Sequence, residues 1–410
     1  MRVLIVGFST RAIAESAVRG QHNVVTVDYF GDLDQRELVP NRALQRDLNV
    51  PFSAQALLAA SDDLDFDAVV YGANLENAPD VVDSLAQRAE LLGNSPGTLR
   101  DVRNWANVRA ACRADGIPCA TTLLPGEEAG VDPTDHWLRK PARGGGGHGI
   151  RRWRGEQLGE DQILQRHIEG IPASAAFIAD GTESVVIGVT EQLVGRKALG
   201  ADGFLWCGNI LPLEFCVSSP DVSRGHASRT IVDGRGLSSS RSMESESASV
   251  LRSVEAMTNA LTRRFGLRGA NGVDLVIARG SGGRPEAHLV EINPRYTASM
   301  ELIERAYQLN VFSCHVAALK GRLPDFALGN RIRSAETYFG KGIVYARHRV
   351  RMPDTRGWVD RDRRDIPFPG EEINAGHPIC TVLAQGQSRA ACWRSLVIKA
   401  DEVRREISRE

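Results

Sequence analysis

Over the first ninety residues, short apolar runs alternate with stretches of helical spacing. The runs at residues 2–7, 24–28 and 67–71 are rich in β-branched residues, and residues 12–19 and 81–92 have helical periodicity. Strands and helices that alternate at this spacing predict a parallel sheet, whose functional loops lie at the carboxyl ends of its strands.

The pattern changes after a Gly-Asn-Ser-Pro turn at residues 93–96. A helical stretch follows at residues 98–115, and strand-like runs then dominate up to about residue 329. We expect one long helix at about residues 245–265, preceded by a serine-rich loop over residues 234–249.

The last eighty residues combine a strand-like run at residues 342–346 with a helical stretch at about residues 390–407. We expect mixed α/β and α+β structure in three domains, at residues 1–95, 96–329 and 330–410.

Composition narrows the class of protein. The chain of 410 residues is 42% hydrophobic and 25% charged, which is typical of a folded protein of two or three domains. Its net charge of −1 lacks the basic excess of a protein held to nucleic acid by phosphate contacts. The longest apolar runs are too short for a membrane span, and residues 9–11 interrupt the N-terminal run before a signal peptide could form. We therefore expect a cytoplasmic protein without nucleic-acid or membrane partners.

Two counts bear on candidate chemistry. The seven cysteines include no C-x-x-C pair, which argues against a thiolate zinc site or a disulfide framework. Only five of the fifty basic residues are lysines. Because Lys and Arg are not equivalent, a lysine within a motif of candidate functional groups is informative in this chain.

The first strand ends in a weak dinucleotide-binding signal. Gly7 is the single glycine where the fingerprint G-x-G-x-x-G needs three, so close approach of the backbone to a pyrophosphate is obstructed. Asp28 stands where a ribose-binding acid would, but many strands of α/β proteins end in Asp. The pattern does not favour NAD binding.

The stronger motif is a lysine followed by a glycine-rich loop. Lys140 ends a strand-like run, and five of the six residues from 144 to 149 are glycines: Gly144, Gly145, Gly146, Gly147 and Gly149. Successive glycine amides can fold over phosphate oxygens, and the lysine adds a point charge. The lysine precedes the glycines, so this is not a Walker A loop. The alternative is a flexible surface loop, in which His148 would simply be solvated.

A third motif places three oxygen ligands on a predicted β-hairpin. Asp274 lies in its first strand, and Glu291 and Asn293 lie two residues apart in its second, so all three are expected on one face. Two carboxylates and an amide oxygen suit magnesium, which phosphate oxygens would complete. The alternative is an ordinary hairpin with solvated polar residues.

Together these motifs resemble the ATP-grasp superfamily, in the order and at the separations that this family shows. The resemblance implies a Rossmann-like pre-ATP-grasp domain, a two-subdomain ATP-grasp fold and a small C-terminal module. It also implies ATP and Mg²⁺ (or Mn²⁺) as cofactors.

The resemblance assigns roles residue by residue. Lys140 and the glycines at 144–147 and 149 match the groups that bind ATP phosphates, and Arg295 matches the catalytic arginine beside the transferred phosphate. Asp274, Glu291 and Asn293 match the metal ligands. Gln165, Arg166, His167 and Ile168 match the hinge segment, whose backbone binds the edge of the adenine ring in this family. Less specifically, Glu76 and Asn77 match a segment that faces the substrate in biotin carboxylase-like members, although Glu76 could equally be a helix N-terminal acid.

Two family features lack a clear match. The second ATP lysine would stand near Trp105, where Arg103 or Arg109 could supply the charge. The ribose-binding acid has only Glu169 and Asp180 as candidates.

The reaction that the resemblance implies is an ATP-dependent carbon–nitrogen ligation of a carboxylate and an amine through an acyl-phosphate, with release of ADP and phosphate. The substrates would be small molecules, such as an amino acid or a cofactor precursor, and a homodimer is one expected assembly. Two alternatives remain open: an ATP- and bicarbonate-dependent carboxylase, and an ATP-binding regulatory protein without turnover.

Overall fold

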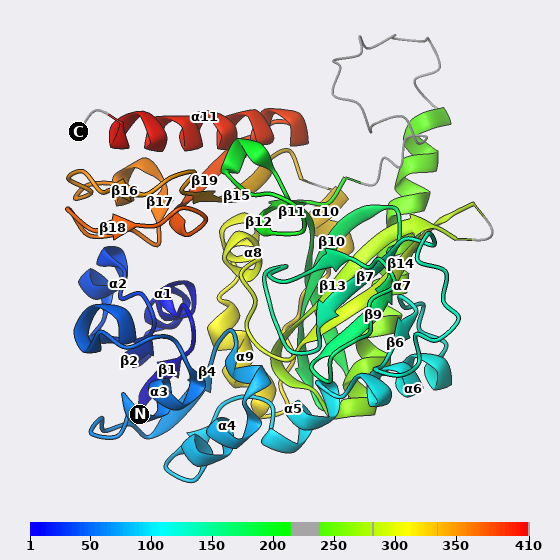
Figure 1. Ribbon diagram of the computed structural model, residues 1–410, viewed down its shortest axis with the longest axis horizontal. Coiled ribbons are helices and arrows are strands. Elements are labelled where there is room, and N and C mark those ends of the chain that lie inside the picture. The colour runs from blue at the N-terminus through cyan, green and yellow to red at the C-terminus, as the bar shows by residue number, and fades with distance from the viewer. Residues whose placement is uncertain (215–237, 281–282, 334, 409–410) are drawn as a thin grey trace.

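The computed structural model describes residues 1–214, 238–280, 283–333 and 335–408 (Figure 1). The N-terminal part contains a five-stranded parallel sheet in the order β3-β2-β1-β4-β5. Its strands are β1 (Arg2–Val6), β2 (Asn23–Asp28), β3 (Asn41–Ala43), β4 (Ala68–Tyr71) and β5 (Glu90–Leu91). The helices around it are α1 (Arg11–Arg19), α2 (Leu33–Leu38), α3 (Ala54–Ala59) and α4 (Pro79–Ala86). The expected α/β architecture is confirmed here.

The strand order reverses between β1 and β4. The chain builds β2 and β3 on one side of β1 and then crosses to place β4 on the other side. The loops that follow these two strands touch, because a Cβ added to Gly7 would lie 3.0 Å from the Cα of Gly72. In open parallel sheets such a reversal is the usual position of a ligand crevice, here at the carboxyl ends of β1 and β4.

A small antiparallel sheet in the order β6-β9-β7-β8 carries the lysine and glycine-loop motif. Its strands are β6 (Thr122–Leu123), β7 (Trp137–Pro141), β8 (Arg151–Arg152) and β9 (Gln162–Arg166). Trp137, Trp153, Leu158 and Leu164 form its core.

A larger sheet in the order β14-β13-β10-β11-β12-β15-β19-β17 spans the rest of the molecule. Its strands are β10 (Ile171–Asp180), β11 (Ser184–Val194), β12 (Trp206–Leu211), β13 (Arg268–Arg279), β14 (Pro285–Asn293), β15 (Tyr338–Tyr345), β17 (Arg363–Arg364) and β19 (Pro378–Gly386). The sheet therefore continues from the central strands into the last eighty residues.

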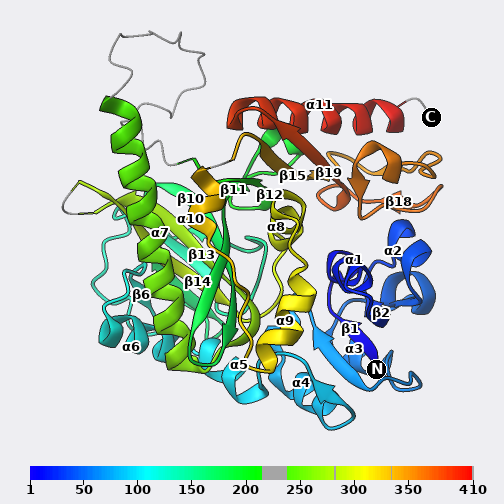
Figure 2. The same cartoon turned by 180° about the vertical axis from the view of Figure 1, so that it is seen from behind.

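Helices cover both faces of this sheet (Figures 1 and 2). The long helix α7 (Ser238–Phe265) shares a core with one face. On the other face, α8 (Met300–Tyr307) and α9 (Val311–Leu319) share a core with the sheet and with α1. The terminal helix α11 (Arg389–Ile407) packs beside β15 and β19. The smaller elements are α5 (Pro96–Val102), α6 (Trp105–Asp115), α10 (Leu328–Arg333), β16 (Val350–Arg351) and β18 (Glu372–Ile373).

Three sequence-based boundaries were wrong. The helix expected at 81–92 ends at Ala86, and residues 90–91 pair with β4 instead. The helix expected at 98–115 is broken into α5 and α6, because the Asn104 side chain accepts the amides of Ala106 and Asn107 and starts a new helix. The helix expected from 245 begins at Ser238, so residues 238–249 are helical rather than a loop; residues 234–237 lie outside the described residues. Among the described residues, no helix has the length and apolarity that a membrane crossing needs.

Candidate active site

The three predicted metal ligands lie side by side on one face of the large sheet. Asp274 on β13 is the register partner of Glu291 on β14, and Asn293 stands two residues further along the same strand. A bulge directly after Asp274 shifts the register, so that Leu275 pairs with Leu289. The backbone thus brings two carboxylates and an amide oxygen together, as the spacing predicts.

Arg103 contacts this group from the break between α5 and α6. Its Nη1 donates to Glu291 Oε1 at 2.7 Å, and its Nη2 donates to the carbonyl of Gly144 in the glycine loop at 3.4 Å. Arg109 on α6 is instead paired with Glu127 and donates to the carbonyl of Thr122 at 2.9 Å. Of the two arginines that the sequence left open, the structure brings Arg103 to the site.

Lys140 approaches from the small sheet. It is buried, and its Nζ donates to Gln165 Oε1 at 3.0 Å and lies 5.9 Å from the centroid of the Trp105 ring. The Trp105 indole also donates to the carbonyl of Ala142 at 3.0 Å. The aromatic residue at the position of the missing lysine thus packs beside Lys140 and fixes the start of the glycine loop.

Arg295 joins the ligand group to the N-terminal domain. Its Nε donates to Glu76 Oε1 at 2.7 Å, and its Nη2 donates to Asn293 Oδ1 at 3.2 Å. Glu76 is buried in the short helix after β4, and its Oε2 has no partner among the described residues. Asn77 Oδ1 is a second buried acceptor of the same kind.

The charges in this group shift one another's titration. Burial and the neighbouring Glu291 raise the pKa of Asp274 to about 6. Burial alone would raise the pKa of Glu291, but Arg103 and Lys140 lower it overall. Burial lowers the pKa of Lys140, although both carboxylates oppose that shift. Perturbed pKa values in one cluster are typical of functional sites.

The glycine loop approaches the β11–β12 connection. The amide of Trp206 donates to the carbonyl of Gly146 at 2.9 Å. Gly147 has φ +79°, and a Cβ there would lie 1.9 Å from the carbonyl oxygen of Phe204, so only glycine fits. His148 is exposed.

The predicted hinge lies along β9 and the residues that follow it. Gln165 is buried and donates to Thr122 Oγ1 and to the carbonyl of Val290, both at 3.2 Å. The amides of Arg166 and His167 donate to the carbonyls of Thr121 and His136. Ile168 follows them, half-buried, in the segment between β9 and β10. Asp180 accepts amides within its own hairpin turn, whereas Glu169 is exposed beside the hinge.

Sequence reasoning missed one residue that touches the ligands. Gln192 on β11 donates to Asp274 Oδ1 at 2.8 Å. An isolated glutamine in a β-branched strand carries no local signal, and the antiparallel order of β11, β10 and β13 is what brings it there.

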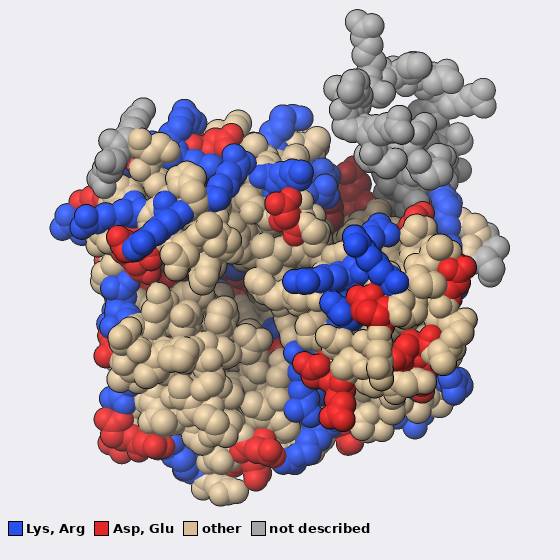
Figure 3. Space-filling model, viewed as in Figure 1, with Lys and Arg blue, Asp and Glu red and all other residues tan. Residues whose placement is uncertain are grey.

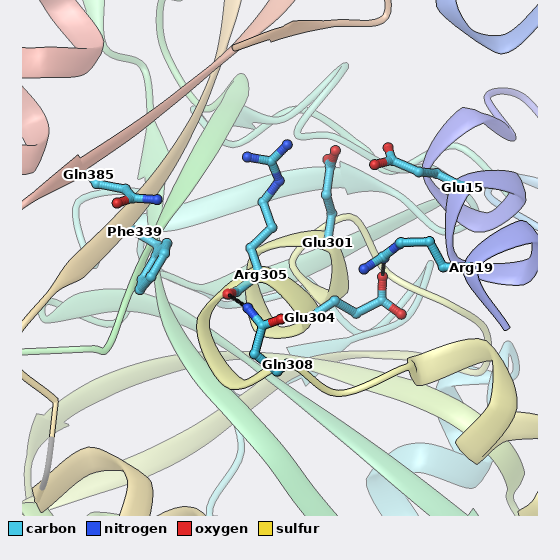
Figure 4. Close-up of a pocket in the computed structure, with 8 residues that line it drawn as sticks. All are labelled: Glu15, Arg19, Glu301, Glu304, Arg305, Gln308, Phe339 and Gln385. Atoms are coloured by element: carbon cyan, nitrogen blue, oxygen red, sulfur yellow. Dashed lines mark hydrogen bonds and ion pairs between the residues drawn. The ribbon is translucent and has the colours of Figure 1, made fainter. Parts of the chain in front are cut away.

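A separate cavity of about 290 Å³ lies where α1, α8, β15 and β19 meet (Figure 4). All three acidic residues that line it are already paired: Glu304 with Arg19, Glu15 with Arg11, and Glu301 with both Arg11 and Lys341. The cavity contains none of the predicted site residues.

The ligand set fits a magnesium ion that carries phosphates. All three donors are hard oxygens, which is the kind of ligand that magnesium prefers. In the part of the chain that the structure describes, no group of three or more His, Cys, Asp and Glu side chains forms a closed metal cage. A set with few protein ligands is what magnesium uses when phosphate oxygens complete its shell.

Residues 116–299 match the family model of the ATP-grasp domain. No curated protein sequence matches the chain. Three similar solved structures differ in activity but share the fold. The biotin carboxylase domain of a single-chain bacterial carboxylase is 15% identical, with a TM-score of 0.65 over 98% of this chain and 88% of that one. An L-amino acid ligase from Bacillus licheniformis is 14% identical, with a TM-score of 0.61 over 98% of this chain and 97% of that one.

The third structure is phosphoribosylamine–glycine ligase from Thermotoga maritima, which is 14% identical, with a TM-score of 0.63 over 99% of this chain and 97% of that one. At such identities the likeness extends to the fold alone. Residues 116–299 therefore match an ATP-grasp domain, and the chain as a whole shares the fold of these structures.

Proposed function

We propose that the protein is an ATP- and magnesium-dependent ligase that joins a carboxylate to an amine through an acyl-phosphate and releases ADP and phosphate. One observation carries the proposal: three cations surround the predicted ligands. Arg103 is paired with Glu291, Arg295 donates to Asn293, and the buried Lys140 lies within the electrostatic influence of Asp274 and Glu291. Cations and carboxylates arranged in this way suit the transfer of a phosphoryl group.

In the first step, an oxygen of the substrate carboxylate attacks the γ-phosphorus of ATP, and the bond to the β–γ bridging oxygen breaks, so ADP leaves. Lys140 and Arg103 hold the phosphates, and Arg295 stabilises the charge on the transferred group. Asp274, Glu291 and Asn293 would hold magnesium, which neutralises phosphate charge when bound.

In the second step, the amine attacks the acyl carbon and phosphate departs with the former carboxylate oxygen. The glycine loop covers the reacting groups and excludes water, which would otherwise hydrolyse the acyl-phosphate. Small molecules such as an amino acid or a cofactor precursor are the proposed substrates. A cytoplasmic location and domain boundaries at about residues 95 and 329 belong to the same proposal.

The test is a product analysis with purified protein, MgATP and a panel of carboxylates and amines. We expect ADP and phosphate to appear only when a suitable pair is present, together with a new amide-type bond detected by mass spectrometry. AMP and pyrophosphate as products would contradict this mechanism.

A second candidate is an ATP- and bicarbonate-dependent carboxylase. The biotin carboxylase fold and the Glu76–Arg295 ion pair favour it. Bicarbonate would then stimulate ADP release in the absence of any amine, which separates it from the ligase. A regulatory ATP-binding protein would bind ATP without products under every condition; Arg103, which supplies a charge near Trp105, argues against such a loss of function.

A further inference from the structure

Four aromatic rings gather at the carboxyl ends of β1 and β2, outside the phosphate site. We call Phe8, Tyr29, Phe30 and Phe52 the aromatic cluster. The Phe8 ring stacks on Tyr29 at a centroid distance of 5.6 Å and an interplanar angle of 7°. It also meets the edges of Phe30 at 5.0 Å and Phe52 at 4.9 Å. Such geometries are the favourable ones for aromatic pairs.

The cluster is only partly buried. Tyr29 and Phe52 rest against the core beneath the sheet, and all four rings keep some exposure to solvent. Leu48 and Val50, which precede Phe52 in the same loop, are 44% and 36% exposed. Figure 3 shows the face of the N-terminal domain over α2 and α3 with few charged side chains, beside a central hollow. An apolar, ring-lined surface next to a hollow is typical of a ligand site.

The cluster borders the crevice where the strand order reverses. The amide of Phe8 donates to the carbonyl of Ala73 at 3.0 Å, so the loop after β1 and the loop after β4 are directly bonded. Ligands of open parallel sheets bind in such a crevice, at the carboxyl ends of the strands on either side of the reversal.

The second wall of this crevice leads to the phosphate site. Asn74 Oδ1 lies 3.5 Å from the position of a Cβ on Gly145 of the glycine loop. Two residues further on, Glu76 binds Arg295 and keeps one buried oxygen without a partner among the described residues. A buried acceptor without a partner is costly unless a ligand satisfies it.

We infer that this crevice binds a substrate that carries a planar, uncharged ring. The ring lies against the aromatic cluster, and the reacting end of the molecule points along the Ala73–Asn77 loop toward Glu76 and Arg295. The inference rests on the proposed ligase and narrows its substrate class: an aromatic amino acid, or a compound of similar shape, rather than a small polar one.

The test compares ring-bearing and ring-free probes in the full-length protein. Binding of L-phenylalanine, L-tryptophan and L-alanine is measured by calorimetry in the presence of Mg²⁺ and a non-hydrolysable ATP analogue, so the result does not depend on turnover. We expect L-phenylalanine and L-tryptophan to bind at least about tenfold more tightly than L-alanine, as expected for burial of a ring against other rings.

Two variants remove a ring and keep apolar volume. In Phe8→Leu and Phe52→Leu, the affinity for the two ring-bearing probes is expected to fall about three- to tenfold, with affinity for L-alanine unchanged. Phe66→Leu is the matched control. Phe66 is a partly buried ring against the same core, but it precedes β4 and so lies at the opposite edge of the sheet.

Equal binding of all three probes, no binding of any, or the same loss in the Phe66→Leu control would overturn the inference. The parallel assay of ADP release separates it from the proposed function. If ADP release depends on small polar substrates alone, the result supports the proposed ligase and contradicts the aromatic site. Ring-specific binding without ADP release under any condition supports the aromatic site and removes the ligase.

Discussion

Arg103 is the residue whose position most changes the chemistry of the site. It is almost fully buried, and it contacts both Glu291 and the glycine loop. In Arg103→Gln, we expect ATP affinity to fall by about 1.5–3 kcal/mol, which is roughly ten- to a hundredfold. The lost group is a charged donor beside the proposed phosphate site, and equilibrium titration of ATP measures the effect.

Arg109→Gln is the matched control, because Arg109 lies on the neighbouring helix but binds Glu127 and the carbonyl of Thr122 rather than the predicted metal ligands. Its ATP affinity should stay within about twofold of the parent protein, since a surface pair contributes little. Equal losses in the two variants would contradict the placement of Arg103 at the phosphates.

Glu291→Gln keeps the shape and an acceptor for Arg103 but removes the negative charge. We expect ADP formation to fall about a hundred- to a thousandfold, the usual effect of removing one electrostatic stabiliser of a transition state. The circular dichroism spectrum should remain that of a folded protein. A folded variant with near-normal ADP formation would remove the metal-ligand assignment.

At the residue scale, the sequence predicted the grouping of those site residues that lie close together along the chain. Glu291 and Asn293 are two apart on one strand, and Lys140 stands beside its glycines, so short spacing was enough to group them. Arg103 and Arg109 could not be separated, because only the helix break at Asn104 turns Arg103 toward β14. The aromatic cluster was not predicted either, since its rings come from three separate loops that the parallel sheet brings together.

At the scale of elements, the glycine loop has one position that admits no side chain. Gly147→Ala would force a residue at φ +79° and place its Cβ 1.9 Å from the carbonyl oxygen of Phe204. The positive φ alone costs about 1–2 kcal/mol, and the clash requires the loop to withdraw from β12. We expect a lower kcat for ADP formation and faster cleavage of the loop by trypsin at Arg143.

Gly144→Ala provides the comparison within the same loop. Its Cβ would meet Pro141 at 3.5 Å, an ordinary contact, and its backbone is not in the positive-φ region. Trypsin sensitivity should stay near that of the parent protein. A Gly147→Ala variant as resistant to trypsin as Gly144→Ala would show that the contact with Phe204 does not hold the loop.

At the scale of the whole molecule, a buried histidine connects three parts of the chain. His315 on α9 accepts the amide of Ala270 on β13 through Nδ1 at 2.8 Å, and its Nε2 contacts the carbonyl of Leu92 after β5 at 3.1 Å. Burial lowers the pKa of His315 to about 4, so the folded protein keeps it neutral.

This shift predicts a loss of stability in mild acid. Below about pH 6.5, His315 is protonated in the unfolded chain but stays neutral in the folded protein. The free energy of unfolding therefore decreases as pH falls from about 6.5 to about 4. The loss is up to about 3 kcal/mol. In His315→Asn, which keeps an acceptor for Ala270, urea denaturation at pH 7 and pH 5 should show a smaller decrease.

His377→Asn, at an exposed position, is the control and should leave the pH dependence unchanged. An unaltered slope in His315→Asn would mean that other groups cause the acid sensitivity. The fold class was predictable from the alternation of strands and helices, but this connection was not, because it joins residues more than two hundred positions apart.

The continuity of the large sheet also affects how the protein is made. β12 pairs with β15, and β15 pairs with β19, so strands translated last complete the sheet that begins near residue 171. On the ribosome, the far edge of β12 stays unpaired until residues up to 345 have emerged, and an unpaired edge is open to association with other chains. Nascent chains of this protein are therefore expected to be most prone to aggregation late in synthesis, after most of the residues proposed to bind ATP have already been made.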